Sequence, residues 1–107
     1  MKVLPLVAAA AAVLAFTTAN AAPDAAGAEK MLKADGCTKC HAVDKAKKGP
    51  AFKKVAADFK GKPDAEAKLT TFLTTGPKIA GSDEAHKSLA GKDAGSVKNL
   101  VQWILAQ

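Results

Sequence analysis

The 107-residue sequence contains no arginine, few aromatic residues, and only two residues each of cysteine, histidine and methionine. Five aromatic side chains give a small domain little apolar mass for a core. We find no paired carboxylates, no nucleophile–base pair and no glycine-rich phosphate loop, which argues against independent catalysis. There is no internal repeat. The net charge of +6 is carried by lysine, but no nucleic-acid recognition motif accompanies it, so a nucleic-acid partner is not expected.

The first 21 residues have the pattern of an export signal. Lys2 is followed by an apolar run and then by Ala19-Asn20-Ala21, which fits the small-x-small cleavage pattern. A retained membrane anchor is the alternative, but the run is shorter than the roughly 20 apolar residues that span a bilayer, and Pro5 interrupts it. We therefore expect a cleaved signal peptide over residues 1–21 and one mature domain over 22–107. That domain is expected in the periplasm of a Gram-negative type of cell, with no stable membrane insertion.

One stretch of the mature chain carries most of the chemistry, Cys37-Thr38-Lys39-Cys40-His41. A C-x-x-C-H run is typical of c-type haem attachment. Two thiols on one tight turn can each form a thioether to a haem vinyl group, and the adjacent histidine can then bind the iron through a ring nitrogen. The motif predicts one covalent haem c, attached through Cys37 and Cys40, with His41 as an iron ligand.

The two cysteines also allow other interpretations. They could form a small disulfide or a thioredoxin-like redox pair, although no strand or βαβ pattern surrounds them. They could supply half of a zinc site, but there is no second cysteine pair and only His86 remains to complete it. Haem is favoured because a buried haem would supply the apolar mass that this small domain lacks.

The mature chain is predicted to be all-α, since apolar residues recur at helical spacing and no convincing strand is present. Helices are expected over residues 24–34, over 52–59, from Pro63-Asp64 to Gly76-Pro77, and from an N-cap at Ser96 to 105. Residues 78–95 are expected to form a loop. The side chains expected to face inward are Ala28, Met31, Leu32, Phe52, Val55, Ala56, Phe59, Leu69, Phe72, Leu73, Val97, Leu100, Val101, Ile104 and Leu105.

The sequence resembles the small bacterial class I cytochromes c, of the short type that includes cytochromes c551 and c552. The resemblance covers most of the mature chain and rests on residues 36–44, 48–53, 55–59 and 101–107. It implies an all-α domain with the haem in a crevice, in which the first helix crosses the last and places Met31 and Leu32 against Trp103. It also implies that the carbonyl of Pro50 accepts a hydrogen bond from the ring of His41, which makes the imidazole a stronger donor to iron.

The chain departs from this family at the sixth iron position. The family brings a methionine there from a loop between its last two helices, but Met1 lies in the signal and Met31 lies in the apolar stripe of the first helix. The corresponding loop contains His86, the only strong neutral nitrogen donor besides His41. Leu89, three residues further on, would pack His86 inward if this loop formed a short helical turn. We therefore expect His41 and His86 to be the iron ligands.

Other arrangements of the sixth position stay open. His86 could be an ordinary surface residue, which would leave the iron open on that side. A lysine is a weaker candidate ligand because it must lose its proton to bind. The lysines concerned are Lys78, Lys87 and Lys92.

Two functions are consistent with these features. The first is a periplasmic one-electron carrier, not an enzyme, with a lower potential than methionine-ligated relatives. Its partners would be redox proteins with acidic docking surfaces, such as multihaem cytochromes or a terminal reductase or oxidase. The second is a haem protein that binds or senses NO, CO or peroxide at an open or displaceable position.

The lysines expected to surround the haem edge are Lys39, Lys45, Lys47, Lys48, Lys53 and Lys54.

Overall fold

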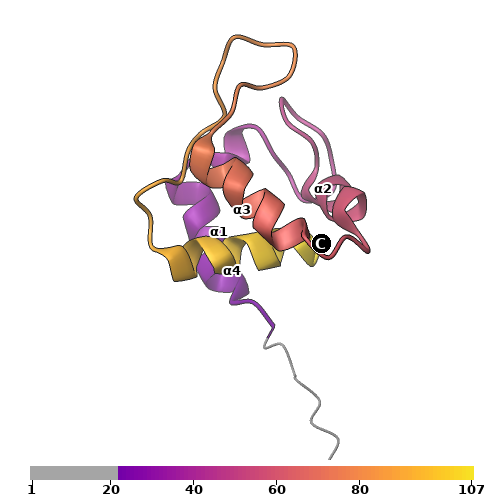
Figure 1. Ribbon diagram of the computed structural model, residues 1–107, viewed down its shortest axis with the longest axis vertical. Coiled ribbons are helices and arrows are strands. Elements are labelled where there is room, and N and C mark those ends of the chain that lie inside the picture. Colours follow the sequence, from indigo (N-terminus) through magenta and orange to yellow (C-terminus); the bar gives the residue numbers. More distant parts are fainter. Residues whose placement is uncertain (1–21) are drawn as a thin grey trace, which may run out of the picture.

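The computed structural model describes residues 22–107, so the expected signal peptide lies outside the described residues. Within them the chain forms four α-helices and no strand, as Figure 1 shows, which confirms the all-α prediction. No helix in this described part is long and apolar enough to cross a membrane. In chain order the elements are α1 (Ala25–Ala34), the 3₁₀ helix η1 (Cys37–Lys39), α2 (Phe52–Phe59), α3 (Ala65–Thr75) and α4 (Ala94–Leu105).

Helix α4 is the element against which α1, α2 and α3 all pack, and α1 crosses behind it in Figure 1. Its apolar stripe is the best buried in the fold, since Leu100 and Val101 are 1% and 0% exposed. Burial of this stripe removes apolar surface from water and is the main source of helix stability here. The buried cluster contains Ala28, Leu32, Phe52, Leu69, Leu89, Val97, Leu100, Val101, Trp103 and Ile104.

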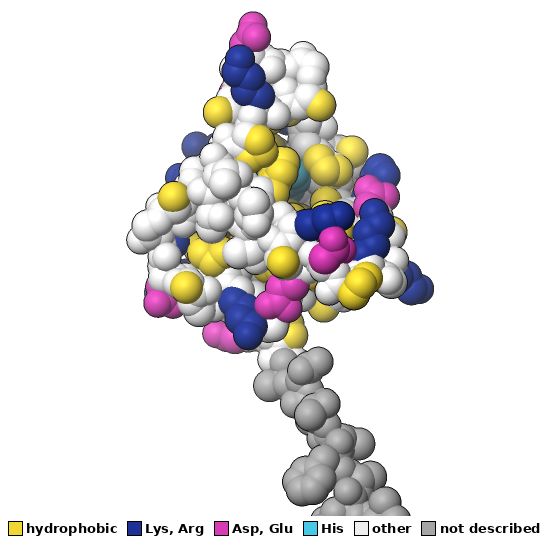
Figure 2. All heavy atoms as spheres, in the orientation of Figure 1, with side chains coloured by type: hydrophobic (Ala, Val, Ile, Leu, Met, Phe, Trp, Pro, Cys, Tyr) yellow, Lys and Arg dark blue, Asp and Glu magenta, His cyan; other side chains and the backbone are white. Residues whose placement is uncertain are grey.

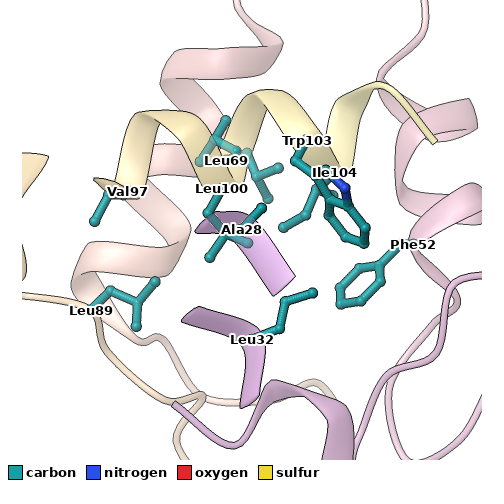
Figure 3. Packing of buried hydrophobic residues seen from close by; sticks show 10 residues of the cluster. Ala28, Leu32, Phe52, Leu69, Leu89, Val97, Leu100, Trp103 and Ile104 are labelled. Carbon is teal, nitrogen blue, oxygen red and sulfur yellow. The ribbon is translucent and has the colours of Figure 1, made fainter. Parts of the chain in front are cut away.

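The crossing of α1 and α4 follows the expectation from the sequence. Leu32 of α1 and Trp103 of α4 belong to the same buried cluster, and Figure 3 shows the ring of Phe52 near both side chains. Met31 is half-buried and packs against this cluster, as expected of a core residue. A pair of hydrogen bonds adds to this packing at the start of α1: the Asp24 N–H donates to Asn99 Oδ1 at 2.7 Å, and Asn99 Nδ2 donates to the Asp24 carbonyl at 2.8 Å.

Two details of the helices differ from the sequence-based prediction. The N-cap of α4 is Asp93 rather than Ser96, because the Asp93 carboxylate accepts from the Ser96 backbone N–H at 2.9 Å and the helix already begins at Ala94. An ionised carboxylate at this position is also favoured by the helix dipole. On α3, Leu69 is buried, but Phe72 is 41% exposed and does not face the core.

Candidate haem site

The C-x-x-C-H run lies on a tight turn directly after α1. Gly36 has a φ of +71°, a left-handed conformation that turns the chain out of the helix and into η1. The His41 N–H then donates to the Cys37 carbonyl at 3.0 Å, which closes the turn. The thiols of Cys37 and Cys40 are both free and half-buried. The structure therefore presents two thiols and an imidazole together on one turn, as covalent haem attachment requires.

Burial raises the pKa of the Cys37 thiol, and the nearby Asp35 carboxylate raises it further. A thiolate at this position is therefore disfavoured. A thioether carries no ionisable group, so the sulfur no longer titrates once it is attached.

The ring of His41 is held on three sides. Its Nδ1 lies 2.7 Å from the carbonyl oxygen of Pro50, as the resemblance implied. Phe52 stacks on the ring with a centre-to-centre distance of 5.2 Å and an interplanar angle of 25°. Gly49 lies so close to the ring that a Cβ atom there would overlap it. Because a carbonyl can only accept, the proton of the neutral ring is on Nδ1, and Nε2 is free to bind a metal.

His86 lies in the loop between α3 and α4, and backbone contacts attach this loop to the end of α3. The His86 N–H donates to the Pro77 carbonyl at 2.8 Å, and the Leu89 N–H donates to the Leu73 carbonyl at 2.7 Å. Leu89 is buried and is 2% exposed. The short helical turn considered for this loop does not form, because residues 86–89 have no helical conformation and their backbone N–H groups donate to Pro77 and Leu73 instead.

The side chain of His86 is half-buried rather than freely exposed. Its Nδ1 lies 2.9 Å from the Lys87 carbonyl oxygen, so this ring too is protonated on Nδ1 when neutral and free at Nε2. Phe72 meets the ring edge-on, with ring centres 4.9 Å apart. This contact explains why Phe72 lies away from the core.

The fold brings the two histidines together. The ring centres of His41 and His86 are 6.2 Å apart, with an interplanar angle of 46°. A metal–nitrogen bond is roughly 2 Å long, so one metal ion bound between two imidazoles separates their centres by about 6 Å. In Figure 2 a histidine is visible inside a hollow whose walls carry apolar side chains. The residues present therefore fit a planar iron cofactor bound from both faces.

Two of the three alternative lysine ligands have another partner. Lys87 and Lys92 are directed to the Asp35 carboxylate, with Nζ–Oδ1 distances of 3.6 and 3.3 Å. For zinc, residues 22–107 offer no group of three or more histidine, cysteine or acidic side chains that could hold a metal ion.

Several of the lysines expected around the haem edge have partners. Lys48 pairs with Glu84 at 2.5 Å, and this contact raises the pKa of Lys48. Lys54 pairs with Asp58 at 3.2 Å within α2. Lys47 donates to the Thr38 carbonyl at 2.6 Å and so covers the attachment turn while keeping its charge. The lysines of the predicted group that have no ion-pair partner among residues 22–107 are Lys39, Lys45, Lys47 and Lys53.

Four residues at or beside the site were not assigned to it from the sequence. Phe52 and Phe72 occur at helical spacing, which only indicated a core role, and Gly49 was interpreted only as a break before Pro50. Asp35 also belongs here, as a buried carboxylate that pairs with lysines of the His86 loop. The Gly-Pro dipeptide was the one sequence signal that could have indicated Gly49.

Comparison with known proteins places this arrangement in a family. The chain is 35% identical over 92 residues to cytochrome c-551 of Allochromatium vinosum, an alignment that covers 86% of this chain and 98% of that protein. The chain belongs to the small class I cytochromes c. This cytochrome is also 35% identical over 80 residues to cytochrome c-551 of Pseudomonas aeruginosa, covering 74% of this chain and 75% of that one. No protein-family model matches the sequence.

Solved structures agree with this assignment. The class 1 cytochrome MtoD from Sideroxydans lithotrophicus ES-1 superposes with a TM-score of 0.76 and 46% identity, covering 79% of this cytochrome and 97% of MtoD. Nitrosomonas europaea cytochrome c552 superposes with a TM-score of 0.62 and 27% identity, covering 73% of this chain and 96% of that one. Family membership implies a covalently attached haem c and the role of a haem-based electron carrier.

Proposed function

We propose that this cytochrome is a periplasmic one-electron carrier whose haem is attached through Cys37 and Cys40 and whose iron is bound by His41 and His86. One observation carries the proposal. The two imidazole rings lie 6.2 Å apart between centres, a separation that suits one iron between them. The expected signal peptide supports the periplasmic location. Covalent attachment of haem c to cysteine, which takes place outside the cytoplasm in bacteria, supports it as well.

The hydrogen bonds of both rings support the same assignment. Backbone carbonyls of Pro50 and Lys87 hold Nδ1 of His41 and His86 at 2.7 and 2.9 Å. Each carbonyl fixes the ring tautomer, orients the ring, and increases the basicity of Nε2 toward a metal. A surface histidine does not need such a partner, since water satisfies its nitrogens.

The axial pair determines what kind of carrier this is. When bound, the haem supplies a one-electron couple at its iron. Two imidazoles donate more strongly than one imidazole and one thioether, so they favour the oxidised state and lower the potential. The His86 loop keeps the sixth position filled in both oxidation states, and the coordination then changes little when an electron is gained or lost.

Charge indicates the kind of partner. The lysines without ion-pair partners near the attachment turn leave a positive surface beside the site, which suits docking to an acidic redox protein. Such a surface increases the encounter rate more than it increases affinity. A multihaem cytochrome or a terminal reductase or oxidase fits this description.

Spectroscopy of the oxidised holoprotein tests the ligand assignment. We expect low-temperature EPR and near-infrared magnetic circular dichroism to report a low-spin iron with two nitrogen axial ligands. We also expect the reduced protein to bind CO slowly. A high-spin iron that binds CO promptly and stoichiometrically would instead support the alternative, a protein that binds or senses small ligands such as NO, CO or peroxide.

A further inference from the structure

A buried carboxylate lies at the end of α1, just before the attachment turn. Asp35, the C-cap residue of α1, is 7% exposed and is the one buried charged residue among residues 22–107. Lys87 and Lys92 reach it from the loop between α3 and α4, at 3.6 and 3.3 Å, while their own side chains remain about half exposed to solvent. Taking a carboxylate out of water is costly unless opposite charge compensates it. Here the compensating charge comes from the loop that carries His86.

The residues of these ion pairs are close in sequence to the attachment turn on one side and to His86 on the other. Asp35 is followed by Gly36 and then by Cys37, the first residue of the attachment turn. Lys87 directly follows His86. The backbone bonds of this loop run to the end of α3 and to Pro77 just after it, whereas its ion pairs with Asp35 run to the segment that carries the attachment turn. These ion pairs thereby join the His86 loop to the segment that leads into the attachment turn.

A second ion pair joins the same loop to the segment that follows the attachment turn, but both of its side chains are exposed. Lys48 and Glu84 lie 2.5 Å apart with side chains that are 60% and 56% exposed. Exposed pairs of this type contribute little and are screened by salt. The pairs of Lys87 and Lys92 with the buried Asp35 are therefore the ones that can hold the loop.

We propose that Asp35 is a positioning residue that uses its ion pairs with Lys87 and Lys92 to keep the His86 loop closed against the attachment turn. The proposal rests on the proposed function, because the position of the loop affects the iron only if His86 binds it. Opening the loop separates both pairs and leaves the Asp35 carboxylate uncompensated. Asp35 thus disfavours the open state, in which an external ligand reaches the iron.

The test is the rate at which CO binds to the reduced holoprotein. When a protein ligand occupies the sixth position, CO binds only after that ligand leaves. Asp35→Asn keeps the shape of the side chain but removes its charge, and the released lysines are exposed enough to be hydrated. We expect the CO-binding rate to rise roughly tenfold, which corresponds to about 1.4 kcal/mol in favour of opening. Asp35→Glu, which keeps the charge, should restore most of the slow binding.

A matched control separates positioning from general destabilisation. Asp58→Asn breaks the exposed pair with Lys54 in α2 and should leave the CO-binding rate unchanged. If Asp35→Asn does not incorporate haem, the double variant Lys87→Gln with Lys92→Gln removes the same pairs from the exposed side. A lower melting temperature with a wild-type CO-binding rate in either variant would overturn the proposal.

The two proposals fail in different ways. If wild-type protein binds CO promptly and His86→Ala binds it at the same rate, His86 is not the ligand and the proposed ligation is wrong. If wild-type protein binds CO slowly, His86→Ala binds it fast, and Asp35→Asn behaves like wild type, the ligation stands and the positioning role of Asp35 is wrong.

Discussion

Gly49 lies against the imidazole ring of His41 so closely that a Cβ atom at this position would be 2.8 Å from Nδ1 and 2.9 Å from Nε2. Contacts this short are not tolerated, so any side chain at position 49 forces the ring or the backbone to move. The φ of Gly49 is not positive, and the constraint is therefore steric rather than conformational. The glycine allows the next residue, Pro50, to bring its carbonyl to Nδ1 of His41.

Substitution of Gly49 by alanine should displace the His41 ring and weaken its hydrogen bond to Pro50. The imidazole becomes a weaker donor, so we expect a higher reduction potential together with a loss of stability of about 1–3 kcal/mol from overpacking. Potentiometry and denaturant unfolding of the holoprotein measure the two effects. Gly95→Ala, which adds a methyl group to the start of α4, serves as the control and should leave the potential unchanged. An unchanged potential in Gly49→Ala as well would contradict this role of the glycine.

The fold itself depends on α4. Leu100 is 1% exposed, and Leu100→Ala should lower the free energy of unfolding by about 2–5 kcal/mol through lost burial and the cavity that remains. The exposed Lys98 of the same helix is the matched control, and Lys98→Ala should change this free energy by less than about 0.5 kcal/mol. Denaturant unfolding followed by helical circular dichroism provides both values. Equal effects of the two substitutions would mean that α4 does not form the core.

The helices could be predicted from the sequence because the signals that define a helix lie within the helix itself or directly beside it. Apolar residues at helical spacing and breakers such as Gly76-Pro77 gave the positions of all four helices within a few residues. The N-cap predicted for α4, Ser96, was wrong because Asp93 and Ser96 are both residue types that cap helices. The hydrogen bond between them, in which Asp93 accepts, is decided by backbone geometry that the sequence does not show.

The candidate site was predictable only in part, because much of it is non-local. The C-x-x-C-H run and Pro50 follow from a motif and a family resemblance. By contrast, the burial of Asp35 depends on lysines from a loop that is distant in sequence. Phe72 was assigned to the core because its spacing matches that of Leu69, whereas it packs against His86, which no helical period reveals.

The lysines near the attachment turn should make electron transfer sensitive to salt. We expect oxidation of the reduced protein by an anionic metal complex to slow as ionic strength rises to about 0.1 M, where the Debye length is about 10 Å. The substitutions Lys39→Gln and Lys45→Gln, combined, should reduce this salt dependence, whereas Lys98→Gln in α4 should not. Stopped-flow absorbance measures the second-order rate constant. A rate that does not vary with salt would exclude steering by these lysines.

Replacement of His86 by methionine should raise the reduction potential. The thioether donates less strongly than imidazole and therefore stabilises the reduced iron. The His86 N–H donates to Pro77, just after α3, and the Leu89 N–H donates to Leu73 of α3; neither bond depends on the histidine side chain. We therefore expect the loop to keep its position. Potentiometry tests the potential, and EPR shows whether the axial pair has changed; a changed axial pair with an equal or lower potential would contradict the expected direction.

Replacement of His86 by alanine should vacate the sixth position without unfolding the protein. The His86 side chain is half-buried and lies outside the buried cluster, so helical content and the covalent haem should persist. With no imidazole opposite His41, the reduced protein should bind CO promptly, and the oxidised protein should show high-spin features. Visible absorption, CO titration and circular dichroism measure these three properties. If absorption, CO reactivity and potential all match those of the wild type, His86 is a surface residue and the sixth ligand lies elsewhere.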